Sequence, residues 1–159
     1  MNFGESNKLK LVFPNVIKIK RPEIKIYNTE LDPFWVTGFI TGEGSFYISI
    51  NKTTHKMRPV FSIGLNVGDK FLLEKMNRFF NNIGSIYTTS SNNSAEIKIF
   101  KLVNISNLIN PLESYPLQGF KLYNFKLWCE IIELLKIENL THEILDKINN
   151  LKNKLNKWD

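Results

Sequence analysis

Residues 35–46 combine small side chains and a carboxylate at a spacing that could do chemistry. Gly38 and Gly42 are four residues apart, so in a helix they lie on one face and let another helix approach closely. Glu43 follows at the end of that face. A two-fold contact between two such helices would bring two carboxylates together, and a divalent cation would offset their repulsion. The same residues also fit a glycine that ends a helix beside an incidental glutamate.

Other metal chemistries have few candidate ligands in this chain. The single cysteine, Cys129, excludes an internal disulfide and a cysteine-based zinc site. His55 and His142 lie far apart and in different contexts, which does not favour a histidine cluster. We therefore expect any metal to bind oxygen ligands, which favours Mg²⁺, an ion that can activate water for phosphodiester hydrolysis.

Polar residues in two predicted hairpins form a second group of candidates. They alternate with apolar residues, as on a strand with one buried face. A polar antiparallel ribbon can lie in the major groove of double-stranded DNA and match its donors and acceptors. A solvated sheet face explains the same residues equally well. The predicted DNA-binding residues are Ser45, Tyr47, Ser49, Asn51, Thr53, Lys56, Arg58, Asn66, Tyr87, Thr89, Ser91, Glu96 and Lys98.

The net charge of +6 is unevenly distributed along the chain. Residues 1–31 carry six basic and three acidic side chains, whereas residues 102–159 carry seven of each. A one-sided excess of this kind is typical of a surface that binds phosphate backbones. A solubilising surface charge is the alternative explanation.

These residues need a scaffold of two hairpins separated by helices. Asp32 as N-cap and Pro33 just inside it predict a helix over residues 33–42. Asp69 is predicted to cap the helix between the hairpins. The resulting αββαββα order predicts an α+β domain with a four-stranded antiparallel sheet, an open polar face and helices behind. The other predicted elements are strands at 45–51, 58–67, 85–89 and 95–101, and helices at 69–80, 105–112, 120–137 and from Thr141 onward.

Residues 35–46 closely resemble the LAGLIDADG motif of homing endonucleases, in which a helix ends in an acidic residue followed by glycine. Glu43 and Gly44 occupy those two positions here. The resemblance extends over residues 31–135 and implies a saddle-shaped DNA-binding sheet, with Glu43 holding a catalytic Mg²⁺. Three later stretches resemble the family in the expected order: Phe61–Val67 with the helix after it, Ile83–Ile86, and Pro116–Lys121.

The resemblance also implies a second catalytic group and a partner. Lys121 matches the family's basic position before the long helix, where its charge would stabilise negative charge on the phosphate. One motif supplies one interface helix, and cutting both strands needs two sites. We therefore expect a homodimer, or pairing with another half, on a pseudo-palindromic site. The predicted interface residues are Val36, Thr37, Gly38, Ile40, Thr41 and Gly42.

Two positions depart from the family pattern. Thr41 stands where the motif often has an earlier acidic residue, whose role is often structural. Near the end of the second strand the family often has Gln or His followed by a basic residue, whereas this chain has Leu65, Asn66 and Gly68. We expect Asn66 to fill the polar role there.

Residues 1–31 are interpreted as a basic arm or linker, and residues 32–159 as a single endonuclease domain. Phe13-Pro14 and Arg21-Pro22 resemble the segment before the second motif of two-motif fungal mitochondrial members. No apolar run is long enough for a membrane span, and the N-terminus resembles neither a signal peptide nor a good transit peptide. The abundance of Asn, Ile and Lys favours A/T-rich, organelle coding, so we expect a mitochondrial location.

Two other functions fit parts of the pattern. A non-cutting intron maturase of the same fold would bind RNA by shape and backbone, and Glu43 would be dispensable. An inert protein-interaction domain would show no salt-dependent affinity for DNA. The second of these leaves the motif and the uneven charge unexplained.

Overall fold

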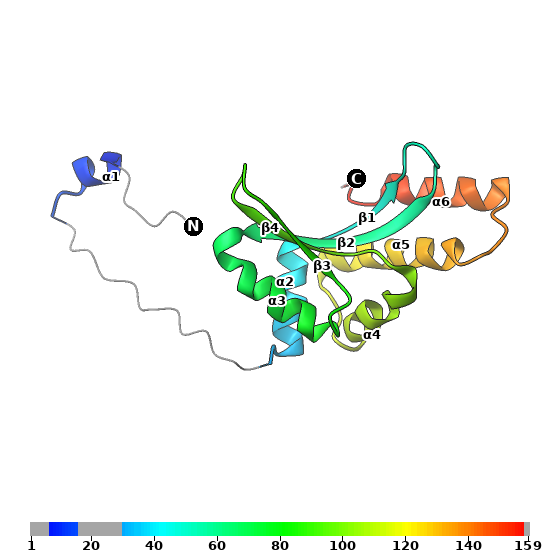
Figure 1. Ribbon diagram of the computed structural model, residues 1–159, viewed down its shortest axis with the longest axis horizontal. Coiled ribbons are helices and arrows are strands. Elements are labelled where there is room, and N and C mark those ends of the chain that lie inside the picture. Colours follow the sequence, from blue (N-terminus) through cyan, green and yellow to red (C-terminus); the bar gives the residue numbers. More distant parts are fainter. Residues whose placement is uncertain (1–6, 16–29, 158–159) are drawn as a thin grey trace.

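A four-stranded antiparallel sheet, in the order β1-β2-β4-β3, organises the protein (Figure 1). The computed structural model describes residues 7–15 and 30–157. Apolar and polar residues alternate in the strands of the sheet, so one face of the sheet is buried and the other is open. The α+β class and the four-stranded sheet are confirmed. The strands are β1 (Gly44–Ile50), β2 (Met57–Asn66), β3 (Ser85–Thr89) and β4 (Ser94–Ile99).

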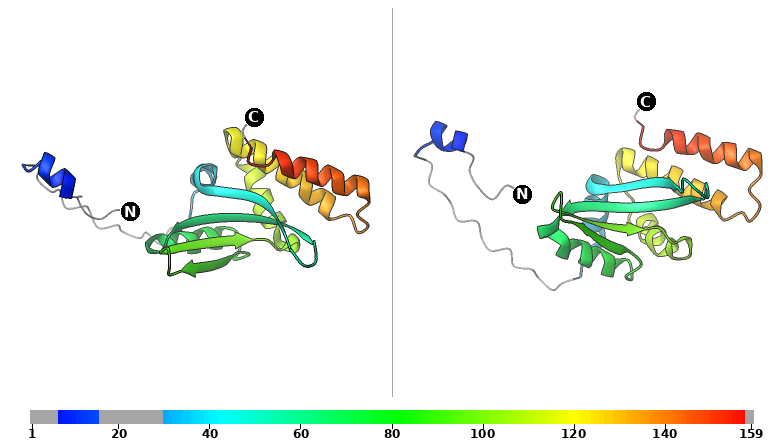
Figure 2. Two further views of the ribbon diagram at one scale, coloured as in Figure 1. Left: turned by 90° about the horizontal axis from the view of Figure 1, so that it is seen from above. Right: turned by 45° about the horizontal axis from the view of Figure 1, so that its top comes forward.

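Helices α2, α3 and α5 contact the sheet, and α6 packs along α5 (Figure 2). Short 3₁₀ turns, η1 (Val67–Asp69) and η2 (Leu102–Asn104), follow β2 and β4. Within the predicted arm, a short helix α1 was not expected, and residues 16–29 lie outside the described residues. The helices are α1 (Asn7–Val12), α2 (Pro33–Glu43), α3 (Lys70–Phe79), α4 (Ser106–Ser114), α5 (Gly119–Leu135) and α6 (His142–Lys154).

Helix α2 begins where the sequence predicts and ends one residue later than predicted, at Glu43. The Asp32 side chain accepts a hydrogen bond from the Trp35 backbone N–H at 3.0 Å, which confirms the N-cap. At the other end the chain turns directly from Glu43 into β1. A Cβ at Gly44 would lie 2.7 Å from both the Cγ2 and the carbonyl oxygen of Ile40, so the tight junction requires glycine. Glu43 therefore stands at the corner between α2 and β1.

The predicted cap of α3 is wrong. Asp69 has φ −101° and ψ 12°, and its side chain makes no capping hydrogen bond. The reason is η1, which separates β2 from α3 and has a cap of its own. The Asn66 side chain accepts from the Gly68 backbone N–H at 3.0 Å. Asn66 therefore has a local structural role at this turn.

The hydrophobic core lies between the helices and the buried face of the sheet. Phe46 on β1 is at its centre, with its ring centroid 5.1 Å from that of Phe61, 5.4 Å from that of Phe125 and 5.2 Å from that of Trp128. Phe46 is also the register partner of Phe61 on β2. Each fully buried side chain of this size contributes about 1.5–3 kcal/mol of transfer free energy. The core therefore fixes β1 against α5.

Side chains from distant parts of the chain bind three backbone carbonyls of β1. Lys121 Nζ donates to the Gly44 carbonyl, Trp128 Nε1 donates to that of Tyr47 at 3.2 Å, and Asn156 Nδ2 donates to that of Phe46 at 2.8 Å. Asn156, just after α6, is itself held because its N–H donates to Asn124 Oδ1 at 2.7 Å. We call Lys121, Trp128 and Asn156 the β1 anchor. It gives partners to carbonyls along a strand at the edge of the sheet.

Candidate functional site

The strand register places most of the predicted DNA-binding residues on the open face of the sheet. Directly paired residues of antiparallel strands point to the same face, and Ser49 pairs with Arg58 while Tyr87 pairs with Glu96. The opposite alternation carries Phe46 and Phe61 into the core. The predicted residues that share the open face are Ser45, Tyr47, Ser49, Arg58, Asn66, Tyr87, Thr89, Glu96 and Lys98.

The same register adds open-face residues that sequence reasoning missed. Val60 pairs with Tyr47, and Ser62 pairs with both Ser45 and Lys98. Reading the alternation through the second strand as well as the first would have found them. The additional residues are Val60 and Ser62, which point to this face but are buried, together with Gly64, Ser85 and Ser94.

The remaining predicted DNA-binding residues lie in the loops that join the strands. Asn51, Thr53 and Lys56 belong to the β1–β2 loop, and Ser91 belongs to the β3–β4 loop. Asn51 Oδ1 accepts from the backbone N–H groups of Thr53 at 2.9 Å and Thr54 at 2.8 Å, so this oxygen holds the loop together. All four residues are exposed.

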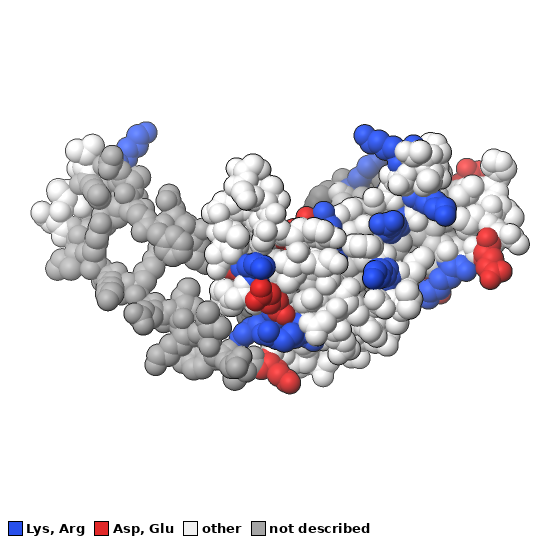
Figure 3. Space-filling view, in the orientation of Figure 1, with Lys and Arg blue, Asp and Glu red and all other residues white. Residues whose placement is uncertain are grey.

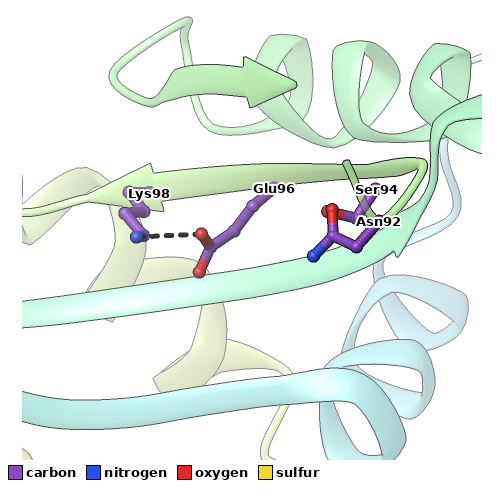
Figure 4. Close-up of polar contacts among 4 residues, drawn as sticks. All are labelled: Asn92, Ser94, Glu96 and Lys98. Carbon is purple, nitrogen blue, oxygen red and sulfur yellow. Dashed lines mark hydrogen bonds and ion pairs between the residues drawn. The ribbon is translucent and has the colours of Figure 1, made fainter. Parts of the chain in front are cut away.

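Charged and aromatic side chains on the open face orient one another. Glu96 and Lys98 form an ion pair at 2.8 Å along β4, beside Ser94, whose hydroxyl donates to Asn92 (Figure 4). The hydrogen bond that Lys98 donates to Glu96 raises the pKa of Lys98 above 10.5, against a smaller opposing effect of burial. Lys98 Nζ also lies 5.9 Å from the centroid of the Tyr87 ring. The face therefore offers both donors and acceptors in fixed positions.

Glu43 and Lys121 lie at one corner of the molecule although they are far apart in the sequence. Glu43 is the exposed last residue of α2, and the half-buried Lys121 in the first turn of α5 donates to the adjacent Gly44 carbonyl. Burial lowers the pKa of Lys121 below 10.5, and the charge of Glu43 partly opposes that shift. A carboxylate and an ammonium group therefore occupy one site.

The groups at this corner suit a weakly held divalent cation. The carboxylate of Glu43 is joined there by the negative end of the α2 dipole, which favours a cation. Within residues 7–15 and 30–157, no group of three or more His, Cys, Asp or Glu side chains gathers as a metal cage. One carboxylate fits Mg²⁺, which usually keeps several waters and takes other ligands from phosphates. Glu43 is the residue that would hold it.

The predicted interface on α2 needs a correction. Val36, Thr37 and Ile40 are buried in the chain's own core, so their side chains are not available to a second copy. Gly38 and Gly42 are exposed, and a Cβ added to either would meet nothing within 4 Å. The glycine stripe therefore faces outward, while the branched residues face inward.

Sequence reasoning missed the large apolar side chains on the exposed surface of α2. Phe34 is 69% exposed and Trp35 is 44% exposed. Trp35 stacks on Phe39 with ring centroids 5.0 Å apart.

Thr41, the last of the predicted interface residues, is half-buried. Its hydroxyl donates to the Thr37 carbonyl at 2.7 Å and accepts from the Gln118 N–H at 3.4 Å, which ties α2 to the start of α5.

In the view of Figure 3, several Lys and Arg side chains surround the β1–β2 hairpin at the upper right. Within the described residues, no helix combines the length and apolar character that a membrane crossing requires.

Comparisons with known proteins agree with this geometry. The family model described as LAGLIDADG endonuclease matches residues 36–132. A protein of Neurospora crassa called probable intron-encoded endonuclease 3 is 31% identical over 95% of this chain, which spans 29% of that relative's length. The I-LtrWI LAGLIDADG homing endonuclease, solved bound to target DNA, is 35% identical with a TM-score of 0.83. That match covers 99% of this chain and 54% of I-LtrWI.

A third relative is closer to this chain in length. The homing endonuclease I-TnaI is 30% identical with a TM-score of 0.73, and the match covers 82% of this chain and 92% of I-TnaI. The family match spans more than half of the sequence and includes α2, the sheet and most of α5. This chain belongs to the LAGLIDADG endonuclease family.

Proposed function

We propose that the protein is a site-specific double-stranded DNA endonuclease that hydrolyses phosphodiesters with a divalent cation, Mg²⁺, held by Glu43. The observation that carries this proposal is the meeting of Glu43 and Lys121 at the start of β1, at the edge of an open polar sheet face. The DNA-bound structure of the relative I-LtrWI supports DNA as the substrate.

The open face would lie in the major groove, where its paired donors and acceptors contact base edges. Lys121 holds a positive charge beside Glu43 and would stabilise negative charge that develops on the scissile phosphate. A cation held by Glu43 would supply Lewis-acid chemistry and lower the pKa of a water ligand. Because burial weakens the hold of Lys121 on its proton, this charge is lost at a lower pH than for an exposed lysine.

Cutting both strands requires a second site, which a second copy or a paired half of the same fold would supply on a long pseudo-palindromic target. The outward face of α2, with Trp35, Gly38 and Gly42, is the proposed interface. Its glycines leave room for close backbone approach, and its aromatics gain by burial. The match covers 92% of I-TnaI, so a single copy of this fold makes up nearly the whole of that relative. A Saccharomyces cerevisiae relative called uncharacterized mitochondrial protein RF1, 28% identical over 83% of this chain, supports the proposed mitochondrial location.

The test is a selection from randomised duplex DNA, with Mg²⁺ for cutting and Ca²⁺ for binding, using the wild type and Glu43→Gln. We expect discrete cleavage by the wild type and a loss on the order of 100-fold or more in the variant, with binding retained, because a metal ligand is lost. Glu113→Gln, an exposed carboxylate on α4, is the matched control and should cut normally. Undiminished cleavage by Glu43→Gln would refute the assignment. Splicing support without cleavage would favour the RNA-binding maturase function.

A further inference from the structure

A pocket lies at the end of the sheet reached by following β1 away from Glu43. It is enclosed by the β1–β2 loop and by the segment that follows β4. Three cationic residues line it: Lys56, Arg58 and Lys101. We call it the hairpin-end pocket. Among the described residues that line it, none carries a carboxylate.

The polar groups of the hairpin-end pocket are mainly donors. Lysine and arginine side chains donate only. Asn51 also lines the pocket, and its Oδ1 already accepts two backbone N–H groups of the loop, which leaves its amide N–H₂ group as the donor. Two backbone bonds fix the loop itself: His55 N–H to the Asn51 carbonyl at 2.9 Å, and Asn51 N–H to the Lys56 carbonyl at 3.0 Å. A preformed set of donors of this kind suits an anion.

Arg58 is oriented before any ligand binds. Its guanidinium carbon lies 5.1 Å from the centroid of the Phe100 ring, and Phe100 also lines the pocket. A guanidinium held against an aromatic ring keeps its edge free to donate in a planar fork, which matches the oxygens of a phosphate.

We propose that the hairpin-end pocket binds one backbone phosphate in the flank of the DNA target. This proposal rests on the proposed function. The length of β1 gives the distance between the pocket and the proposed metal site. Asn51 is eight residues after Glu43, and at about 3.3 Å per residue of β1 the pocket lies roughly 26 Å from the metal site. Phosphates of one DNA strand advance about 3.4 Å per nucleotide, so the bound phosphate is about six to nine nucleotides from the cut.

The first test uses the full chain and the double variant Lys56→Gln/Lys101→Gln, with a selected target duplex in Ca²⁺ between roughly 50 and 200 mM salt. We expect the slope of log K against log salt to decrease in size by about 1 to 2, because phosphate contacts are lost. The base preference should not change. The matched control, Lys126→Gln/Lys147→Gln, removes two exposed lysines from α5 and α6 and should keep the wild-type slope.

The second test replaces single phosphates of the target by uncharged methylphosphonates. We expect wild-type affinity to fall at one position about six to nine nucleotides from the cut, and the double variant to be insensitive at that position. The two losses are then not additive, which identifies the pocket as the place of contact.

Three results would overturn this assignment. An unchanged salt slope in the double variant, with wild-type binding and cutting intact, refutes the pocket and leaves the proposed function standing. Binding of millimolar inorganic phosphate at constant ionic strength to the wild type but not to the double variant, without any displacement of DNA, assigns the pocket to a free anion. A wild type that binds no duplex refutes both proposals.

Discussion

The two edges of the sheet are held in opposite ways. The edge at β1 is fixed by the β1 anchor, whose three side chains come from α5 and from the residue after α6. The edge at β3 pairs only with β4, and Ser85, Tyr87 and Thr89 along it are exposed. Elements with few buried contacts open at low free energy, whereas anchored ones do not. The protein is therefore rigid where Glu43 and Lys121 lie and adaptable where the sheet is most exposed.

This difference matches what the two edges are proposed to do. Catalysis requires reacting groups to be held within a fraction of an ångström, and a shift of about 1 Å can reduce a rate by about 100-fold. Base contacts tolerate more adjustment, because side chains and water can adapt to the groove. Variants at the two edges test whether they differ in this way.

Trp128→Ala should cost about 3–5 kcal/mol of the free energy of unfolding, because it removes a fully buried ring and its hydrogen bond to β1. Tyr87→Ala, at the β3 edge and 47% exposed, should cost less than about 1 kcal/mol. Urea unfolding monitored by far-UV circular dichroism measures both. Equal losses in the two variants would remove the distinction between the edges.

Asn156→Ala should cost about 1–3 kcal/mol, since the Phe46 carbonyl loses its partner in a partly buried setting, whereas the backbone N–H of residue 156 still donates to Asn124. Asn156 also has φ +60°, a conformation that alanine adopts less readily than asparagine. We further expect slower cleavage at saturating DNA with unchanged affinity. Asn153→Ala, exposed near the end of α6, is the control. A loss of affinity with normal cleavage would contradict the link between the anchor and catalysis.

Lys121→Met should change how stability depends on pH. Burial lowers the pKa of Lys121 in the folded protein below the ordinary 10.5, so the unfolded chain binds this proton more tightly. The penalty is fully present below the lowered pKa and disappears as pH rises toward 10.5, so stability increases across that window. The variant should lack this increase, as measured by urea midpoints at several alkaline pH values. The exposed Lys126→Met should keep it, and an increase that persists in Lys121→Met would refute the assignment.

Glu96→Gln should change stability by no more than about 0.5 kcal/mol, because the ion pair with Lys98 is partly exposed and water screens it. Its effect should instead be on base preference, since the partner that orients Lys98 is weakened. Sequencing of selected targets measures this. Glu74→Gln, which breaks the exposed pair with Lys70 on α3, is a matched control that should leave the preference unchanged.

The sequence predicts the elements well because their signals are local. Asp32 and Pro33 mark the start of α2, and the alternation around Phe46 and Ser49 separates the buried face from the open one. The inward face of α2 was not predictable in the same way. Its Trp35, Val36 and Ile40 distribute apolar side chains around the whole helix, so periodicity does not say which side enters the core.

The β1 anchor is the other feature that local patterns could not predict. An asparagine such as Asn156, beyond the last helix, carries no sign that it donates to Phe46. Lys121 was singled out through the family resemblance, and its contact with the Gly44 carbonyl appears only in the folded chain. Such contacts depend on the path of the whole chain, which only the structure supplies.

The β1 anchor also determines when during synthesis the corner at Glu43 can be completed. Its bonds join residues separated by 77, 81 and 110 positions, so α2 and the whole sheet leave the ribosome before Asn156 exists. At about 5–20 residues per second, synthesis of the 110 positions from Phe46 to Asn156 takes on the order of 5–20 s. A chain that ends early keeps Glu43 and the sheet but lacks part of the anchor. We therefore expect products that stop before Asn156 to cut the proposed DNA target poorly.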